Sequence, residues 1–376
     1  MVVERTGEEE GPAPAGGVVN WSGRVSLDRR SLLRLGAVGG IGAASAAGFL
    51  YAGGWFSPER LTPARFADRF EHVFGRHEGF RRNHAKGVAV SGYFTGNGHG
   101  SSLSTASVFA AGRTTVTGRF SLAGGMPYVT DSPATVRGLG LLFQLPDGEQ
   151  WRTAMVNIPV FTDRVPEGFY ARLLASRPDP STGKPDPAAM GRFLARFPET
   201  ARAMAHIAAH PATSGFADST FHGLNAFRFV DAVGRSTPVR WRFVPHDSAP
   251  PAPAAHPTGR DALFDALVSR FAAGPLRWDL ELVVGEPGDP TDDATTPWPA
   301  GRRTVTAGTL TLDTADTEAP GNARDINFDP LVLPSGIAPS DDPLLSARSA
   351  VYSASYTRRS GEPKTPSAVH AQEARP

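Results

Sequence analysis

At positions 81–94 the chain reads Arg81-Arg82-Asn83-His84-Ala85-Lys86-Gly87-Val88-Ala89-Val90-Ser91-Gly92-Tyr93-Phe94. The second half of this stretch is apolar and alternating, which is typical of a β-strand, and the polar residues before it indicate a turn. A histidine held where a turn enters a strand points in a fixed direction, and imidazole is well suited to moving protons near neutral pH. His84 is therefore a candidate catalytic residue.

Strands and helices are expected on both sides of this stretch. The expected strands are short apolar segments between Gly, Asp and Pro turns, at 88–95, 114–121, 139–145, 154–160, 225–230, 239–244, 278–284 and 304–312. The expected helices carry apolar residues at helical spacing or begin at capping residues, and they cover 62–74, 168–176, 188–197, 200–210, 263–271 and 343–358. These patterns predict an α+β fold with the strands of an antiparallel sheet or barrel, inserted helices and a C-terminal helix; the resemblance described below favours the antiparallel β-barrel.

The composition narrows the class of protein. With 376 residues, of which 40% are hydrophobic, the chain can bury one large core or two ordinary ones. Its formal net charge of +1 gives no basic surface that would favour a nucleic-acid partner. The absence of cysteine excludes disulfides, thiolate catalysis, iron–sulfur clusters and zinc-thiolate sites, and it is compatible with export.

The N-terminal part has the pattern of an export signal. Residues 1–24 form a leader containing Gly, Pro and Glu that we expect to be disordered. In the segment 25–57, the pair Arg29-Arg30 precedes a small-residue apolar run, which is typical of the twin-arginine signals of folded exported proteins. The run has about twenty residues, enough to span a bilayer. We therefore expect an exported, periplasmic or extracytoplasmic protein that meets an export translocon, with the signal either cleaved or kept as a membrane anchor through 29–55. The alternative is a buried Gly/Ala-rich helix.

The last expected helix carries an arginine and a tyrosine one turn apart. Arg348 and Tyr352 have the spacing i, i+4, so both side chains lie on one face of the helix. A guanidinium beside a phenol favours the phenolate, which is a good ligand for ferric iron, and tyrosine is one known axial ligand of haem. The same spacing also occurs on ordinary helix surfaces, so evidence from other parts of the chain is needed to support a role for this pair in haem binding.

Several fragments, in the same order along the chain, resemble the catalase family. His84 and the Ala-Lys-Gly that follows it match the segment of the family's distal histidine. The other matching fragments are Arg119-Phe120-Ser121, Val136-Arg137-Gly138-Leu139-Gly140-Leu141-Leu142-Phe143, Val156-Asn157-Ile158-Pro159-Val160-Phe161 and Arg348-Ser349-Ala350-Val351-Tyr352. The resemblance implies a catalase-like haem domain over 58–360, followed by a tail, 361–376, that we expect to be disordered.

Within this family the chain is similar to the short, exported catalase-related peroxidases. It stops soon after the helix of Tyr352, so the C-terminal helical domain of ordinary catalases is expected to be missing. Asn83 stands where typical catalases carry a small apolar residue over the haem, and Phe161-Thr162 replaces a pair of phenylalanines. Both departures indicate a more polar or more open pocket, and therefore weak or no dismutation of hydrogen peroxide.

The resemblance implies a role for each matching residue above the haem. His84 would move the proton of a bound hydroperoxide, and Asn157 would orient the peroxide by hydrogen bonding. Ser121 would hold the other ring nitrogen of His84 and so fix its tautomer. Either Phe161 or Phe169 would form an aromatic wall over the porphyrin.

Other residues would hold the cofactor, haem b. Arg81 and Arg119 would pair with its propionates, and Tyr352, assisted by Arg348, would be the axial ligand of the iron. The implied enzyme is an oxidoreductase, a peroxidase that reduces organic hydroperoxides or hydrogen peroxide with electrons from an unidentified donor. The alternatives are a catalase-like isomerase of lipid hydroperoxides and an exported haem-binding protein without turnover.

Three other patterns carry less weight. His206 and His210 lie one helical turn apart, but no third metal ligand accompanies them. The glycine-rich segment 96–100 lacks the helix and lysine of a phosphate-binding loop, so a surface turn is expected. His222 fits a packed histidine of the barrel.

Overall fold

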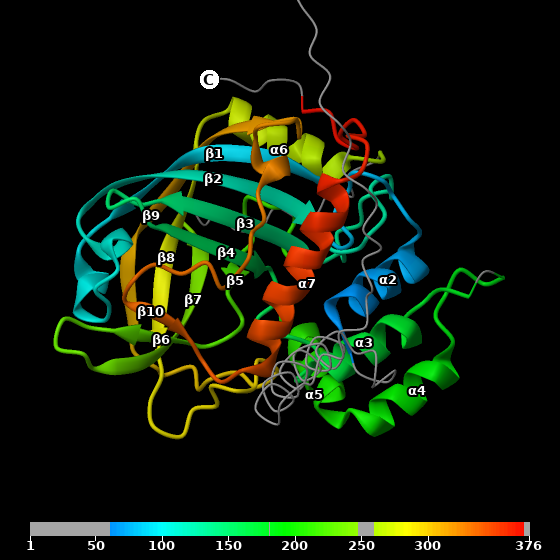
Figure 1. Ribbon diagram of the computed structural model, residues 1–376, viewed down its shortest axis with the longest axis horizontal. Helices are drawn as coiled ribbons and strands as arrows, with labels where there is room; N and C mark the ends of the chain where they lie inside the picture. Colours follow the sequence, from blue (N-terminus) through cyan, green and yellow to red (C-terminus); the bar gives the residue numbers. More distant parts are fainter. Residues whose placement is uncertain (1–60, 180, 247–258, 372–376) are drawn as a thin grey trace, which may run out of the picture. The chain divides into compact units, whose positions relative to one another are not determined.

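The fold is built on one antiparallel sheet (Figure 1). The structure is a computed structural model, and it describes residues 61–179, 181–246 and 259–371. The strands are β1 (Gly87–Gly96), β2 (Gly112–Leu122), β3 (Arg137–Gln144), β4 (Gln150–Val156), β5 (Phe221–His222), β6 (Phe227–Val230), β7 (Ser236–Pro245), β8 (Leu276–Val284), β9 (Thr304–Asp316) and β10 (Ile337–Pro339). Because β7 pairs with β8 as well as with β5, eight strands, β1–β5 and β7–β9, close into a barrel. Strands β6 and β10 continue the sheet beyond β7.

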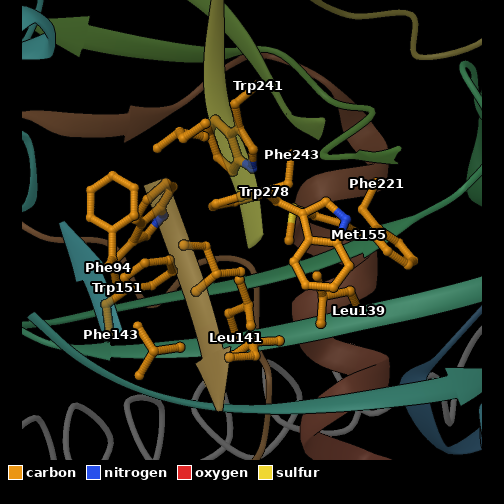
Figure 2. Packing of buried hydrophobic residues seen from close by; sticks show 14 of the residues in the cluster. Phe94, Leu139, Leu141, Phe143, Trp151, Met155, Phe221, Trp241, Phe243 and Trp278 are labelled. Atoms are coloured by element: carbon orange, nitrogen blue, oxygen red, sulfur yellow. The ribbon is translucent and has the colours of Figure 1, made fainter. Parts of the chain in front are cut away.

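Alternation of side chains along the strands separates the core from the outer face of the barrel. Phe120 of β2 pairs with Val88 of β1 and with Leu139 of β3, and all three are buried in the core. Figure 2 shows Leu139 among the large aromatic side chains that fill the barrel. Arg119 and Ser121 flank Phe120 in the sequence, so they point to the outer face. That face carries the candidate site.

Helices pack on the outside of this barrel. They are α2 (Pro63–Phe74), α3 (Pro166–Ala175), α4 (Pro187–Arg196), α5 (Pro198–Ala208), α6 (Ala262–Ala272) and α7 (Pro343–Ser360), with a short 3-10 turn at Ala323–Asp325. Five of the six begin with proline, whose missing N–H needs no partner in the first turn. Figure 1 shows α7 crossing the outside of the sheet, and α7 contacts both α2 and α3.

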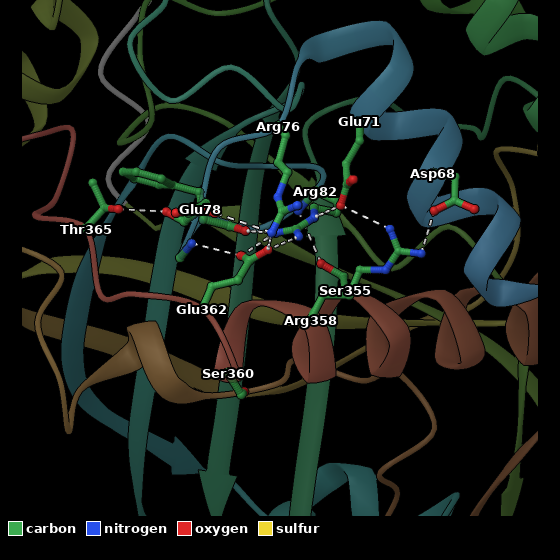
Figure 3. Close-up of polar contacts among 12 residues, drawn as sticks. Asp68, Glu71, Arg76, Glu78, Arg82, Ser355, Arg358, Ser360, Glu362 and Thr365 are labelled. Carbon is green, nitrogen blue, oxygen red and sulfur yellow. Dashed lines mark hydrogen bonds and ion pairs between the residues drawn. The ribbon is translucent and has the colours of Figure 1, made fainter.

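Ion pairs join α7 and the segment after it to α2 (Figure 3). Arg82 is buried and pairs with Glu71 of α2 at 2.7 Å and with Glu362 at 2.5 Å. Arg358 of α7 pairs with Glu71 at 3.0 Å and with Asp68 at 2.6 Å. Because Arg82 lies two residues before His84, this network also fixes the turn that carries the histidine.

The structure confirms the expected fold class, and it adds the short strands β5 and β10, which were not among the expected strands. Two further differences concern segments whose structure was expected. Strand β4 begins at Gln150, earlier than the expected 154–160, because the chain leaves the sheet after Val156. The tail after Ser360, expected to be disordered, is packed on the domain over residues 361–371, where Val369 is 1% exposed. The tail lacks a periodic pattern, but its apolar residues and Glu362 have buried partners in the domain.

The expected leader, 1–24, and signal segment, 25–57, lie outside the described residues. Among those that are described, no helix is long and apolar enough to cross a membrane.

Candidate active site

A cavity of about 450 Å³ lies beside the barrel. Residues of β2, β3 and β4 form one wall, and α2, α3 and α7 contribute the others. Among the described residues that line it are six arginines and no acidic side chain, and most of the remainder are apolar. His84 and Tyr352 both line this cavity, so residues 268 positions apart in the numbering meet at one site.

His84 is fixed by its backbone and by three neighbours. Its φ is 56°, a left-handed conformation that residues other than glycine rarely adopt. Nη1 of Arg119 donates to the His84 carbonyl at 2.8 Å, and Oγ of Ser121 lies 3.1 Å from Nδ1. Gly138 of β3 leaves the space for the ring, since a Cβ at this position would lie 2.9 Å from Nδ1. With Nδ1 beside Ser121, Nε2 is the nitrogen left to act on a bound molecule.

The surroundings of His84 keep its imidazole neutral. Burial lowers the pKa of His84 to about 3, and the positive charges of Arg119, Arg81 and Arg348 act in the same direction. The neutral ring is the form that accepts a proton. The three arginines expected at the site from the sequence therefore lie close enough to influence His84.

Arg348 and Tyr352 lie on α7, and the arginine is held by a chain of hydrogen bonds. Its Nη2 donates to the carbonyl of Ala154 at 2.8 Å, and its Nη1 donates to Oδ1 of Asn225. Asn225 is fully buried, and its Nδ2 donates to Oδ2 of Asp342, the N-cap of α7, at 2.7 Å. In this structure the guanidinium therefore contacts Asn225 and Ala154 and does not donate to the Tyr352 hydroxyl.

Arg119 has other partners than the propionates expected from the sequence. Its Nε and Nη2 donate to the carboxylate of Glu318 at 2.7 Å and 2.9 Å, and the carbonyls of His84 and Ala85 take its other bonds. Burial would raise the pKa of Glu318, but the charge and hydrogen bonds of Arg119 outweigh it and lower the pKa. Arg119 thus fixes the turn of His84, and these contacts use four of its five N–H donors.

Arg81 and Arg359 form no ion pair with any described residue, although both line the cavity. Nη2 of Arg81 donates to the carbonyls of Ala323 and Ile326, both at 2.9 Å, and Nη2 of Arg359 shares the Ile326 carbonyl at 3.1 Å. Burial lowers the pKa of Arg81 well below its ordinary value and that of Arg359 to about 10, and neighbouring arginines add to both effects. This corner of the cavity carries positive charge that the protein does not compensate.

Asn157 lies next to the cavity but is not one of its lining residues. Its Oδ1 accepts a hydrogen bond from the backbone N–H of Arg137 at 2.8 Å, while its neighbours Val156 and Ile158 line the cavity. Val156 pairs with Gly138 in the sheet, which places this apolar side chain on the same face as the ring of His84. The expected role of Asn157 in orienting peroxide stays a prediction.

The opposite part of the cavity is aromatic. Phe161 and Phe169 both line it, with ring centroids 5.9 Å apart, so the structure brings both candidate aromatic residues to the site. Phe169 also contacts Phe66 and Phe70 of α2, at centroid distances of 6.4 Å and 6.0 Å. Asn83 lines the cavity as well, and its Oδ1 accepts a hydrogen bond from the N–H of Gly124 at 2.9 Å.

The remaining histidine patterns lie elsewhere. The rings of His206 and His210 are 4.6 Å apart between centroids, and no cluster of three metal-ligating side chains occurs in the described ranges. His222 lies on β5, where burial, aided by the charge of Arg242, lowers its pKa to about 4. The segment 96–100 runs from the end of β1 into a 3-10 turn, as expected for a surface turn.

Comparison with known proteins shows to which family the chain is related. A sequence model of the family described as "Catalase" matches residues 60–365. The chain belongs to the catalase family. A catalase-related peroxidase of Synechococcus elongatus is 39% identical over 306 residues, which cover 81% of this chain and 90% of that protein. A second catalase-related peroxidase, of Mycolicibacterium paratuberculosis, is 33% identical over 304 residues, which cover 80% of this chain and 96% of that protein.

Solved catalase structures share the fold of this catalase-family protein. A bacterial catalase matches with a TM-score of 0.65 at 22% identity, and a fungal catalase with a TM-score of 0.66 at 19% identity. The match covers 81% and 79% of this chain, respectively, and 62% of each catalase chain. These comparisons confirm the expected catalase-like fold, the catalase-related subgroup and the enzyme class, an oxidoreductase acting on peroxide.

Three residues of this catalase-family site were not expected from the sequence. Arg359 follows Tyr352 by seven residues, two helical turns, so its spacing could have placed it on the same face of α7. Asn225 and Glu318 had no such signal. Each is far along the chain from its partner, 123 residues for Asn225 to Arg348 and 199 for Glu318 to Arg119, and only the barrel brings them together.

Proposed function

We propose that this catalase-family protein is a haem b peroxidase that reduces hydroperoxides, with a preference for organic hydroperoxides and weak or no dismutation of hydrogen peroxide. The observation that carries the proposal is the cavity in which His84 and Tyr352 meet and in which the guanidiniums of Arg81, Arg348 and Arg359 make no ion pair with the described residues.

The lining of the cavity fits haem b. Haem is a large apolar ring system with two carboxylates, and the cavity is largely apolar with an arginine-rich corner. Arg81 and Arg359, which share the Ile326 carbonyl, would pair with the propionates, since buried cations require anionic partners. Tyr352 would bind the iron, and Arg348 lies one turn away on the same face of α7. When bound, the haem would supply the two electrons that cleave the peroxide bond.

The residues around His84 would then move the proton of the substrate. Ser121 holds Nδ1 of His84, so Nε2 would take the proton of the hydroperoxide and give it to the departing oxygen. That transfer lets the departing oxygen leave as an alcohol or as water. The Arg119–Glu318 pair would keep the His84 carbonyl fixed, and so hold Nε2 in one position during both transfers.

The aromatic end of the cavity favours an organic substrate. Phe66, Phe70 and Phe169 give this end an apolar surface, and Leu173 of α3 extends it. An alkyl or aryl group on the peroxide would bury apolar area there, which contributes about 25 cal/mol for each Å² removed from water. Hydrogen peroxide has no such group, so it gains nothing from this surface.

Reconstitution with iron protoporphyrin IX tests the proposal. We expect a ferric Soret band and, with cumene hydroperoxide, the oxidation of a one-electron donor at two equivalents for each peroxide consumed. A lipid hydroperoxide isomerase would consume its substrate without a donor, and a haem-binding protein without turnover would leave the peroxide unchanged. Failure to form a Soret band would overturn the proposal.

We also propose that the protein is exported by the twin-arginine route. The pair Arg29-Arg30 before a small-residue apolar run supports this proposal. Replacing both arginines with lysine should keep the full-length protein in the cytoplasmic fraction of a host that has this export system, whereas the unchanged chain should leave it. Equal distribution of both proteins would contradict the proposal.

A further inference from the structure

Tyr356 lies on α7 one turn after Tyr352 and occupies an unusual position. Like Tyr352, it lines the cavity, and both side chains are half-buried. Its hydroxyl makes no hydrogen bond with any described residue, and the guanidinium of Arg359 lies 4.8 Å from the centroid of its ring. A second oxidisable ring thus lines the cavity, and the residue that follows it on α7, Thr357, is exposed to solvent.

A peroxidase requires a path for electrons from its donor. In the proposed function the cavity holds both the haem and the organic group of the hydroperoxide, so electrons from an external donor would have to reach the cofactor through a residue of the lining. Among the described tyrosines and tryptophans, Tyr352 and Tyr356 are the two that line the cavity. Tyr352 is the proposed iron ligand, which leaves Tyr356 as the oxidisable side chain between the cofactor site and the surface.

We propose that Tyr356 passes electrons from an external one-electron donor, such as a substituted phenol, to the active site. This proposal rests on the proposed peroxidase function. Reduction of a hydroperoxide to an alcohol and water takes two electrons, which the one-electron donor must supply in two steps. In each step Tyr356 gives one electron to the cofactor and its phenolic proton to water, and the tyrosyl radical then takes one electron and one proton from the donor. The two protons released to water balance the two consumed when the peroxide is reduced.

The neighbouring charge determines how Tyr356 can be oxidised. Loss of an electron alone would create a positive ring beside the guanidinium of Arg359, and like charges at this distance repel. Loss of the proton together with the electron leaves a neutral radical, which avoids that repulsion. Because the side chain is partly exposed, water can accept the proton. Arg359 itself stays in position, since it donates to the carbonyls of Arg324 and Ile326.

The test compares Tyr356→Phe with Tyr170→Phe in the haem-loaded protein. Tyr170 is a matched control, because it contacts the cavity residue Phe66 at a centroid distance of 5.2 Å but does not line the cavity. After mixing with cumene hydroperoxide and no donor, we expect a tyrosyl radical in the electron paramagnetic resonance spectrum of the unchanged protein and of Tyr170→Phe. Ring-deuterated tyrosine should narrow the signal. In Tyr356→Phe the signal should be lost.

Kinetics provide a second measurement. Tyr356→Phe should lower the turnover of a bulky phenolic donor at least tenfold, while the first reaction with cumene hydroperoxide, followed by stopped-flow absorbance, keeps its rate within twofold. The phenyl ring preserves the packing, and an unchanged Soret band would show that the cofactor is still bound. If the radical persists in Tyr356→Phe, or donor turnover is unchanged, the role of Tyr356 is overturned and the peroxidase proposal stands. If the unchanged protein does not react with the hydroperoxide, both proposals fail.

Discussion

At the scale of single residues, the backbone of His84 is as important as its ring. The left-handed conformation at φ 56° turns the chain so that Nδ1 reaches Ser121, and the bond from Arg119 to the His84 carbonyl keeps the turn in place. Asparagine adopts this conformation more readily than most residues, but it cannot accept a proton as imidazole does. An asparagine at this position would therefore keep the backbone conformation of His84 and remove its ability to transfer a proton.

Replacing His84 with Asn should therefore preserve folding and remove proton transfer. We expect kcat/KM for cumene hydroperoxide to fall by roughly 10²- to 10⁴-fold, the usual contribution of a general acid–base group, with an unchanged Soret band. His84→Ala should lose the same activity and about 1–2 kcal/mol of stability as well, because alanine is disfavoured in the left-handed conformation. Equal activity of His84→Asn and the unchanged protein would show that another group moves the proton.

The low pKa of His84 also predicts a pH dependence. Since the folded-state pKa is about 3 against an ordinary 6.5, the imidazole stays neutral at neutral pH, and its contribution to kcat/KM should be constant from pH 5 to 8. Between the two values the unfolded chain binds one more proton than the folded chain, so this residue's contribution to stability falls as the pH drops from 6.5 to 3. A decline in kcat/KM centred near pH 6.5 that His84→Asn abolishes would contradict the shifted pKa.

At the scale of the elements, strand β3 and helix α7 form two walls of the site, and they differ in how well the sequence predicts them. A short apolar segment between turns was enough to place β3, and an N-capping aspartate followed by proline, Asp342-Pro343, was enough to place α7. The same patterns could not show that Gly138 faces His84, because this contact depends on the register between β2 and β3. They also could not show that Arg119 pairs with Glu318, since a single arginine in a strand gives no information about its partner.

Gly138→Ala tests the fit between β3 and the histidine. The added Cβ would lie 2.8 Å from Oγ of Ser121 and 2.9 Å from Nδ1 of His84, so the ring must move. We expect kcat/KM to fall at least tenfold in a protein that still folds and binds haem. Gly191→Ala in α4 is the control, because nothing lies within 4 Å of its new Cβ, and it should stabilise the helix by roughly 0.5–1 kcal/mol without changing activity.

The contact between α2 and α7 is testable through Arg82. Arg82→Leu leaves the carboxylates of Glu71 and Glu362 without their buried partner. Removing one partner of a buried ion pair lowers the free energy of unfolding by about 3–5 kcal/mol. Arg358→Leu is a matched control at a more exposed position and should cost no more than about 1 kcal/mol. Urea unfolding would measure both. Similar losses for the two variants would contradict the importance of burial at Arg82.

The ion pair between Arg82 and Glu362 also predicts how the stability of the protein changes in acid. Burial would raise the pKa of Glu362, but hydrogen bonds from Arg82 and from the N–H of Gly79 outweigh it and lower the pKa. A carboxyl group with a lowered folded-state pKa stabilises the protein above its unfolded-state value and loses that contribution as the pH falls through the folded-state pKa. The stability difference between the unchanged protein and Arg82→Leu should therefore shrink in acid.

At the scale of the whole molecule, the barrel and helices enclose more positive charge than they neutralise. Arg81, Arg348 and Arg359 line one cavity without an ion pair among the described residues, and the pKa shifts of Arg81 and Arg359 show that the fold destabilises these charges. The sequence as a whole is nearly neutral, with a formal net charge of +1, so its composition gave no sign of this local excess. A dianionic ligand should therefore stabilise the folded protein.

Porphyrins that differ only in their carboxylates would test this charge balance. Iron protoporphyrin IX should raise Tm more than its dimethyl ester, because the ester leaves Arg81 and Arg359 without anionic partners. The difference should become smaller in Arg81→Gln, which removes one of the two cations. Equal stabilisation by the two porphyrins would indicate that the propionates do not meet these arginines.

The glycine at position 138 also limits how this protein can be altered. Glycine is the smallest residue, so every substitution adds atoms directly beneath the ring of His84, and none can enlarge the space there. Any substitution at this position is therefore expected to displace the ring of His84. Attempts to redesign the enzyme for larger peroxides should instead begin at Phe66 and Phe70, where side chains on α2 can be shortened without reaching β3.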